Sequence, residues 1–295
     1  MTTSYVADVH RWYAAHARDL PWRRPEATPW SILVSEVMLQ QTPVSRVLPA
    51  HAAWLGRWPD PASLAAASPA DAVRQWDRLG YPRRAVRLHA SADLITTRFA
   101  GEVPASADQL RTLPGVGSYT AAAVSSFAFG GRHAVLDTNV RRVLARVVTG
   151  AALPAPAPSA AERQLAEGLL PEDGRLAARW SVGVMELGAL VCTASRPRCG
   201  ECPLVGQCTW VRHGRPAAQH RRAAPGYHGS DRQCRGQLLA VLRGTRGPVA
   251  ADVLAAAWPD SAQRSRALSG LIDDGLVSRA ACGSFSLPGD AALSD

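Results

Sequence analysis

The stretch CTASRPRCGECPLVGQC, residues 192–208, decides the fold of this 295-residue chain. Its cysteines follow the spacing C-x6-C-x2-C-x5-C, so their thiolates can converge on one inorganic centre. Such thiolate sets hold zinc or an iron–sulfur cluster, and a loop without histidine favours the cluster. Two disulfides are the alternative, but the chain shows no secretory signal and disulfides rarely persist in a reducing compartment. The expected ligands are Cys192, Cys199, Cys202 and Cys208.

Composition limits the class of protein. A hydrophobic content of 47% predicts packed cores, and a formal net charge of +9 favours a polyanionic partner such as nucleic acid. No stretch approaches the roughly 18 apolar residues of a membrane span, so we expect a cytoplasmic protein without a membrane partner. All 33 basic residues are arginine. A mechanism that needs a lysine amine, such as a Schiff base with an opened sugar, is therefore excluded.

Apolar residues recur at three- and four-residue spacing along most of the chain, which predicts a mainly α-helical fold. The Ala/Pro-rich run 151–160 is expected to be an exposed loop. Residues 213–232 are polar, rich in arginine and interrupted by proline, as in a basic linker. We therefore expect a large helical region over residues 1–212 and a small module over residues 233–295.

The C-terminal module is predicted to contain three helices followed by two strands. The expected ranges are 237–242, 250–257 and 261–274 for the helices and 276–287 for the strand pair. This order fits a winged helix whose third helix presents Arg264 and Arg266 to DNA. A small helical cap over apolar surface is the alternative. Cys234 and Cys282 have no partner pattern and are expected to be buried thiols.

The segment Leu113-Pro-Gly-Val-Gly117 lies between two helical stretches. Two glycines one residue apart allow neighbouring backbone amides to point outwards together, as an anion-binding turn requires. An ordinary turn between helices is the alternative. The small-residue helix that follows, Ser118–Ala123, and the later segment Val135–Val140 favour the functional interpretation.

Two carboxyl groups are candidates for catalysis. Glu36 falls in an otherwise apolar helix, where desolvation should raise its pKa and keep it protonated. Asp137 precedes a helix that starts near Thr138, and an N-cap position favours the ionised form. One neutral and one ionised carboxyl group is the pairing used in glycoside cleavage. A surface glutamate and a purely structural cap are the alternatives.

The turn at Leu113–Gly117, which we call the hairpin, resembles that of the helix-hairpin-helix DNA glycosylases that carry an iron–sulfur cluster. Asp137 and the four-cysteine loop strengthen this resemblance. Within that superfamily, Leu20–Arg23, Val34–Thr42 and Leu79–Tyr81 resemble the MutY adenine DNA glycosylase family. The resemblance covers roughly residues 4–212 and implies a two-lobed fold and a [4Fe-4S] cluster. It assigns about residues 25–130 to a six-helix lobe, and residues 1–24 with 131–212 to an iron–sulfur lobe.

The resemblance also implies an activity. It is that of a monofunctional DNA glycosylase of base excision repair, which hydrolyses the N-glycosidic bond of adenine mispaired with 8-oxoguanine or guanine in double-stranded DNA. Glu36 would be the general acid, Asp137 would stabilise the oxocarbenium-like sugar, and Asn139 would orient Asp137 and the attacking water. Tyr119 stands where lyase members carry a lysine and cannot form an imine. A nucleoid-associated monomer is expected.

DNA contacts follow from the same resemblance. Trp22 and Arg23 match part of the adenine pocket. A second set of residues is expected to enter the minor groove as a wedge. The hairpin is expected to bind a DNA phosphate together with a monovalent cation, and arginines of the cysteine loop to contact further phosphates. The wedge residues are Gln41, Thr42, Leu79 and Tyr81; the hairpin residues are Gly115, Val116 and Gly117; the arginines are Arg196 and Arg198.

Three departures leave other functions open. Val182 stands where the family has Gln or Glu against the flipped adenine, and Pro82 stands where a second aromatic is frequent. The family's usual Nudix-like C-terminal domain is not expected within this sequence, because residues 228–295 are too few for it. A mismatch thymine or uracil DNA glycosylase of the same superfamily is therefore one alternative. A non-catalytic iron–sulfur DNA-binding protein is the other.

Overall fold

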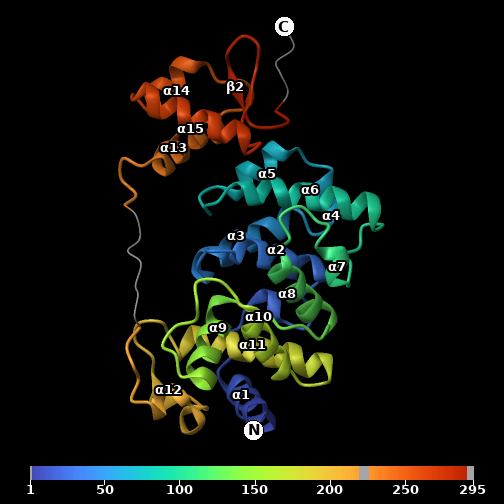
Figure 1. Ribbon diagram of the computed structural model, residues 1–295. Coiled ribbons are helices and arrows are strands. Elements are labelled where there is room, and N and C mark those ends of the chain that lie inside the picture. The colour runs from blue at the N-terminus through green and yellow to red at the C-terminus, as the bar shows by residue number, and fades with distance from the viewer. Residues whose placement is uncertain (1, 219–225, 291–295) are drawn as a thin grey trace. The chain divides into compact units, whose positions relative to one another are not determined.

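The computed structural model describes residues 2–218 and 226–290, and it is mainly α-helical, as predicted (Figure 1). Contacts divide the chain into two compact units. Unit 1 comprises Met1–Ile32, Ala105–Arg111 and Val116–Arg222, and unit 2 comprises Leu33–Pro104, Thr112–Gly115 and Ala223–Asp295. In the described part of the chain, no helix is both long and apolar enough to cross a membrane.

Unit 1 contains the whole N-terminal helix and the region before and around the cysteines. Its helices are α1 (Thr2–His16), α7 (Ala107–Leu110), α8 (Ser118–Phe129), α9 (Thr138–Leu144), α10 (Ala160–Gly168), α11 (Gly174–Leu190) and α12 (Thr209–Arg212). Short turns of other helix types are η1 (Pro21–Arg23), η2 (Ala145–Thr149), η3 (Cys199–Glu201) and η4 (Val205–Gln207). Helix α2 (Pro29–Leu39) begins in unit 1 and ends in unit 2. The run 151–160 is largely exposed and precedes α10, so the loop prediction is confirmed.

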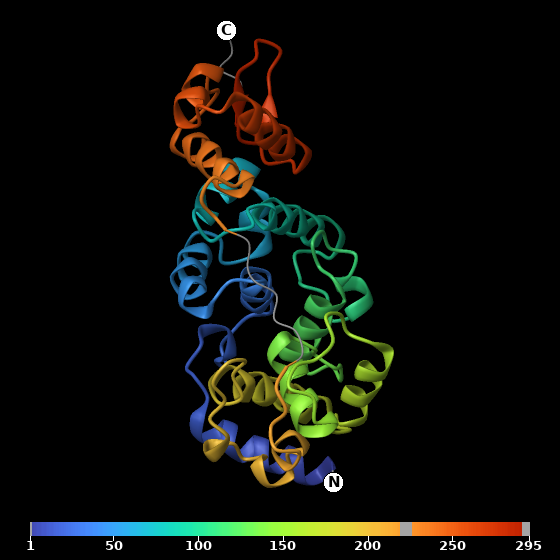
Figure 2. The same ribbon diagram turned by 60° about the vertical axis from the view of Figure 1, so that its left-hand side comes forward.

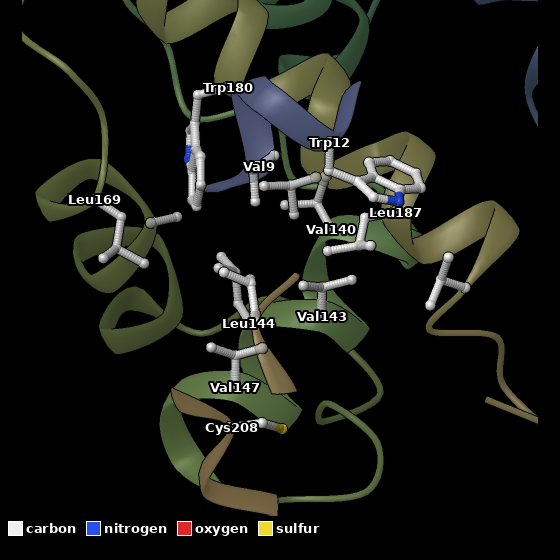
Figure 3. Packing of buried hydrophobic residues seen from close by; sticks show 14 of the residues in the cluster. Val9, Trp12, Val140, Val143, Leu144, Val147, Leu169, Trp180, Leu187 and Cys208 are labelled. Atoms are coloured by element: carbon white, nitrogen blue, oxygen red, sulfur yellow. The ribbon is translucent and has the colours of Figure 1, made fainter. Parts of the chain in front are cut away.

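The core of unit 1 forms where α1, α9 and α11 pack together. Figure 3 shows Val9, Trp12, Val140 and Leu187 pointing toward one another, with Val147 and Cys208 further along the same cluster. Helices α9 and α11 approach closely at Gly188, where a Cβ atom would lie 2.7 Å from Asn139 Cβ and 2.9 Å from its carbonyl oxygen. No side chain fits there, so Gly188 sets the distance between α11 and the start of α9.

Unit 2 contains a bundle of helices and the C-terminal module. Its helices before the linker are α3 (Val44–Arg57), α4 (Pro61–Ala65), α5 (Pro69–Trp76) and α6 (Arg83–Arg98). Trp54 is fully buried and meets Trp58 and Trp76 edge-on, with ring centroids 4.7 and 5.5 Å apart. Helix α5 starts at a Ser-Pro pair: Ser68 accepts the amide hydrogen of Asp71, and Pro69 occupies the first turn.

The C-terminal module consists of α13 (Asp231–Gly244), α14 (Ala251–Ala257) and α15 (Ser261–Asp273), followed by the antiparallel strands β1 (Ser278–Arg279) and β2 (Phe285–Ser286) (Figure 2). Val249 adds an isolated antiparallel bridge to Phe285. The predicted helices and strand pair are confirmed, although α13 starts at residue 231 and not at 237. Ser230 caps that earlier start by accepting the Gln233 amide hydrogen.

The two cysteines of the C-terminal module differ in exposure. Cys234 is buried, but Cys282 is exposed in the turn between the strands, so the prediction of a buried thiol is wrong there. A lone cysteine carries no sequence signal for its position on a hairpin. The central part of the predicted basic linker, residues 219–225, lies outside the described residues.

Candidate active site and cysteine loop

Asp137 is the N-cap of α9, as predicted. One carboxylate oxygen accepts the Val140 amide hydrogen at 2.6 Å, and the other accepts from Asn139 Nδ2 at 2.8 Å. Burial raises the pKa of Asp137, and the hydrogen bonds from Val140 and Asn139 and the charge of Arg142 offset only part of that effect. The cap alone predicted a bias toward the ionised form; the half-buried position adds a desolvation cost that works against it.

Arg142 connects Asp137 to the cysteine loop, and sequence reasoning missed it. Its Nη2 donates to Asn139 Oδ1 at 2.8 Å and to the Gly188 carbonyl at 2.7 Å, while Nε donates to the Cys192 carbonyl at 2.7 Å. The Asn139 side-chain amide therefore accepts a hydrogen bond from Arg142 with its oxygen and donates one to Asp137 with its nitrogen. This chain of hydrogen bonds fixes the orientation of the Asn139 side chain.

The four cysteines line one cavity in unit 1. The empty volume there is about 350 Å³, a figure that includes open solvent. Cys192 follows α11, Cys199 opens η3, Cys202 ends it, and Cys208 is the N-cap of α12. Apolar side chains complete the lining; they include Val143, Val147, Val191, Val205, Trp210 and Val211. No disulfide joins any of the six cysteines, all of which lie in the described part of the chain, so the disulfide alternative is not realised.

Arg146 forms the polar wall of this cavity. It is 3% exposed, its Nη1 lies 3.3 Å from Cys192 Sγ, and the same nitrogen donates to the Thr193 carbonyl at 2.8 Å. Its guanidinium stacks on Trp210 at 4.5 Å. Burial raises the pKa of Cys202 to about 11, so this thiol would have to lose its proton in order to ligate a cluster. Four thiols, an apolar wall and one buried cation fit an iron–sulfur cluster.

The segment that contains Trp22 and Arg23 is anchored on α11 by Glu186. This carboxylate is fully buried and accepts hydrogen bonds from Nε and Nη2 of Arg18, both at 2.7 Å. It also forms an ion pair with Nη1 of Arg23 at 2.8 Å. Burial opposes the charge, but the hydrogen bonds and charges of Arg18 and Arg23 outweigh it and hold the pKa of Glu186 below its ordinary value. Trp22 is itself buried in η1. The signal for Glu186, a lone carboxylate in apolar α11, was present in the sequence.

Glu36 lies in α2 of unit 2 and is 5% exposed, between the buried residues Ser35 and Val37. Its predicted burial in an apolar helix is therefore what the structure has. Tyr119 is half-buried in the first turn of α8. Val182 is half-buried on α11, in unit 1.

The two wedge segments meet through Arg84, which sequence reasoning also missed. Arg84 is 7% exposed and lies over the ring of Trp76, 5.1 Å from its centroid. Its Nη1 donates to three carbonyl oxygens at the end of α2, and Nη2 donates to Thr42 Oγ1 and to the Gly80 carbonyl, both at 2.9 Å. Burial lowers the pKa of Arg84 to about 10.

The wedge residues differ in exposure. Gln41 has a φ of 57° and is exposed, and Tyr81 has a φ of 48° and is 53% exposed. Thr42 and Leu79 are buried, at 7% and 5%. Only the first two thus present side chains at the surface of unit 2.

The hairpin segment has the predicted turn. Gly115 has a φ of 81°, and a Cβ atom there would lie 3.0 Å from Arg87 Cδ. Ser91 Oγ donates to the Pro114 carbonyl at 2.8 Å, which holds the turn on α6. Val116 is buried, and Gly117 is the N-cap of α8 without a side-chain cap. Arg196 is exposed, and Arg198 pairs with Glu201 at 2.9 Å.

Comparison with known proteins shows which family this chain resembles. A family model described as an HhH-GPD superfamily base excision DNA repair protein matches residues 34–171, and the iron-sulfur binding domain of endonuclease III matches residues 192–208. An adenine DNA glycosylase of Mycolicibacterium smegmatis is 52% identical over 280 residues, which cover 95% of this chain and 94% of that protein. A thymine-DNA glycosylase of Aeropyrum pernix is 36% identical over 203 residues, covering 68% and 90%. The solved structure of a thermostable thymine-DNA glycosylase superposes with a TM-score of 0.65 and 26% identity over 72% of this chain and 97% of that one.

The chain therefore belongs to the HhH-GPD superfamily of base excision DNA repair proteins, and within it to the adenine DNA glycosylases. The predicted helix-hairpin-helix fold is confirmed. Its four-cysteine loop is an iron–sulfur binding domain, and the expected [4Fe-4S] cofactor is confirmed. DNA is its partner.

Proposed function

We propose that the protein hydrolyses the N-glycosidic bond of adenine mispaired with 8-oxoguanine or guanine, as a monofunctional DNA glycosylase. The main support for this proposal is the 52% sequence identity to an adenine DNA glycosylase over almost the full length of both proteins. The absence of lysine from the sequence supports a reaction that stops at the abasic site.

The residues divide the reaction between them. Glu36 donates a proton to a purine ring nitrogen, so adenine leaves as a neutral base. Asp137 supplies negative charge beside the oxocarbenium-like sugar, and Asn139 holds the carboxylate while water adds to the sugar carbon. The hydrogen bond of 2.8 Å between Asn139 and Asp137 supports this role. Cys192, Cys199, Cys202 and Cys208 would hold the cluster, which would order their loop and take no part in the hydrolysis.

DNA recognition is assigned to four places. The adenine pocket includes Trp22 and Arg23, and the base stack is opened by the wedge residues Gln41, Thr42, Leu79 and Tyr81. The Gly115–Gly117 turn binds a DNA phosphate together with a monovalent cation. Further phosphates are contacted by Arg196 and Arg198. The protein binds DNA through these contacts as a monomer that is associated with the nucleoid. We retain residues 213–232 as a basic linker and residues 233–295 as a winged-helix module, supported by the helix order and the bridge from Val249 to Phe285.

A panel of duplexes tests this function. The substrates contain adenine opposite 8-oxoguanine, adenine opposite guanine, thymine opposite guanine and uracil opposite guanine, and alkali then cleaves the abasic sites. We expect release of adenine from the first two. Release of thymine without adenine would support a thymine glycosylase, which Val182 and the 36% identity to the A. pernix enzyme favour as the second candidate. Binding without release of any base would support a non-catalytic DNA-binding protein.

A further inference from the structure

The loop between α5 and α6, residues 77–82, has an unusual backbone. Asp77, Gly80 and Tyr81 adopt positive φ angles of 41°, 90° and 48°. Two of these residues are not glycine, and such conformations persist only where neighbouring contacts hold them. The loop contains Leu79 and Tyr81, which belong to the proposed wedge.

The first end of this loop is held by α13. Arg243, half-buried near the end of that helix, donates from Nη1 to the Asp77 carbonyl oxygen at 2.5 Å. A charged donor therefore satisfies the carbonyl of a residue in a strained conformation. Asp77 is also the C-cap of α5, so this contact lies where helix becomes loop.

The second end is held by the residue that follows α15. Asp274 pairs with Arg83, the first residue of α6, at 3.1 Å between Oδ1 and Nη1. Asp274 also forms an ion pair with Arg235 of α13. One carboxylate thus joins two helices of the module to the point where the loop enters α6.

A largely buried ion pair fixes the module on α5. Asp290 accepts both terminal nitrogens of Arg74, at 2.8 and 2.6 Å, and these side chains are only 9% and 14% exposed. Arg74 also donates to the Thr245 carbonyl at 2.9 Å. Gly289 packs so closely that a Cβ atom would lie 3.0 Å from Pro69 Cδ. The contacts at Asp77 and Arg83 are therefore flanked by a tightly packed, bidentate anchor.

We propose that the C-terminal module is a brace for the α5–α6 loop, in which Arg243 and Asp274 are positioning residues for Leu79 and Tyr81. The module then contributes to recognition of damaged DNA by holding the wedge in shape. The use of the loop on DNA rests on the proposed function, whereas the brace is a property of the free protein.

Hydrogen exchange in the free protein tests the brace. The reporter is the Leu79 amide, which donates to the Trp76 carbonyl at 3.1 Å. Arg243→Gln should accelerate its exchange about tenfold, since a charged hydrogen bond is lost. Asp274→Asn should accelerate it about two- to fivefold, because its pair with Arg83 is partly exposed.

Matched controls remove the same charges nearby. Arg246→Gln and Asp273→Asn alter exposed residues of the same module and should leave the Leu79 amide unchanged. Arg83→Gln removes the same ion pair with Asp274 by changing the residue on α6. It replaces Asp274→Asn as the test variant if that substitution disturbs the fold of the module. Parent-like exchange in both Arg243→Gln and Arg83→Gln would overturn the proposal.

Binding separates the brace from the proposed function. The probes are a duplex with a stable abasic analogue opposite guanine and the fully paired duplex. Arg243→Gln should lower the preference for the abasic duplex about tenfold without changing the melting temperature of the protein by more than a few degrees. A parent that releases no adenine refutes the proposed function and leaves the exchange result intact. A parent that releases adenine, with parent-like exchange in the variants, refutes the brace alone.

Discussion

Nε of Arg142 donates to the carbonyl oxygen of Cys192 at 2.7 Å, across a sequence separation of 50 residues. The same guanidinium holds Asn139, which holds Asp137. A cluster ligand and the proposed catalytic carboxylate are therefore joined by three consecutive polar contacts. The loop that binds the cofactor and the start of α9 form one hydrogen-bonded network, so we expect a disturbance at the cysteines to reach Asp137 through these contacts.

Loss of one cluster ligand should reveal this connection. We expect Cys199→Ser to bind iron at least about tenfold more weakly and to release adenine more slowly, because loss of the cluster would loosen the loop that carries the Cys192 carbonyl, the acceptor of Arg142 Nε. Iron and sulfide analysis of the purified protein, with single-turnover base release, measures both effects. Cys282→Ser is the matched control, since that thiol is exposed on the C-terminal hairpin. Full iron content in Cys199→Ser would contradict the ligand assignment.

Asp137→Asn separates charge from capping. Asparagine caps helices about as well as aspartate, so the unfolding free energy should change by less than about 1 kcal/mol. Base release in single turnovers should fall about 100- to 1,000-fold, because the charge beside the sugar is gone. Asp173→Asn, at the exposed N-cap of α11, is the control and should keep full activity. A parent-like rate for Asp137→Asn would remove this residue from the mechanism.

The pH dependence of the parent follows from the same residue. Burial raises the pKa of Asp137 above its ordinary value, and the proposed role needs the ionised form. Activity should therefore fall as the pH drops through that raised pKa, at a higher pH than for an exposed aspartate. Single-turnover rates measured from neutral pH downward give the midpoint. An acid limb centred at or below pH 3.8, the ordinary value, would conflict with this assignment.

Local patterns made much of this molecule predictable. The cysteine spacing, the two glycines of the hairpin turn and the cap at Asp137 are each encoded within a few neighbouring residues, and the structure has each of them. Arg84 and Arg142 were not predictable, because nothing local distinguishes them among 33 arginines. Their roles come from carbonyl oxygens that tertiary packing brings together. The exposed position of Cys282 is decided in the same way, by the hairpin on which it lies.

Arg84 should be a position in unit 2 at which stability is sensitive to substitution. Arg84→Met removes the donor for the carbonyl groups of Val37 and Met38, and each buried acceptor left without this partner costs about 1–3 kcal/mol. We expect a loss of at least about 3 kcal/mol in the free energy of unfolding, measured by urea titration. Arg98→Met, at the exposed end of α6, should change it by less than about 0.5 kcal/mol. Equal losses in the two variants would rule out the network as the cause.

Glu186 should make unit 1 sensitive to acid. Its pKa in the folded protein is lowered by Arg18 and Arg23, against the effect of burial, so its contribution to stability is complete above its unfolded pKa, about 4.3. That contribution is lost as the pH falls through the lower, folded pKa. At pH 7, Glu186→Gln should cost about 2–3 kcal/mol, less than a fully buried pair because Arg18 is 34% exposed.

Urea titrations at several pH values test this sign. The stability difference between parent and Glu186→Gln should be constant near neutrality and shrink below about pH 4. Glu201→Gln breaks an exposed pair with Arg198 and should cost less than about 1 kcal/mol at any pH. Because Glu186 also holds Arg23, its loss should weaken binding of adenine-containing duplex more than that of an abasic duplex. A Glu186→Gln difference that stays the same down to pH 3 would mean that packing, and not the buried charge, is what Glu186 contributes.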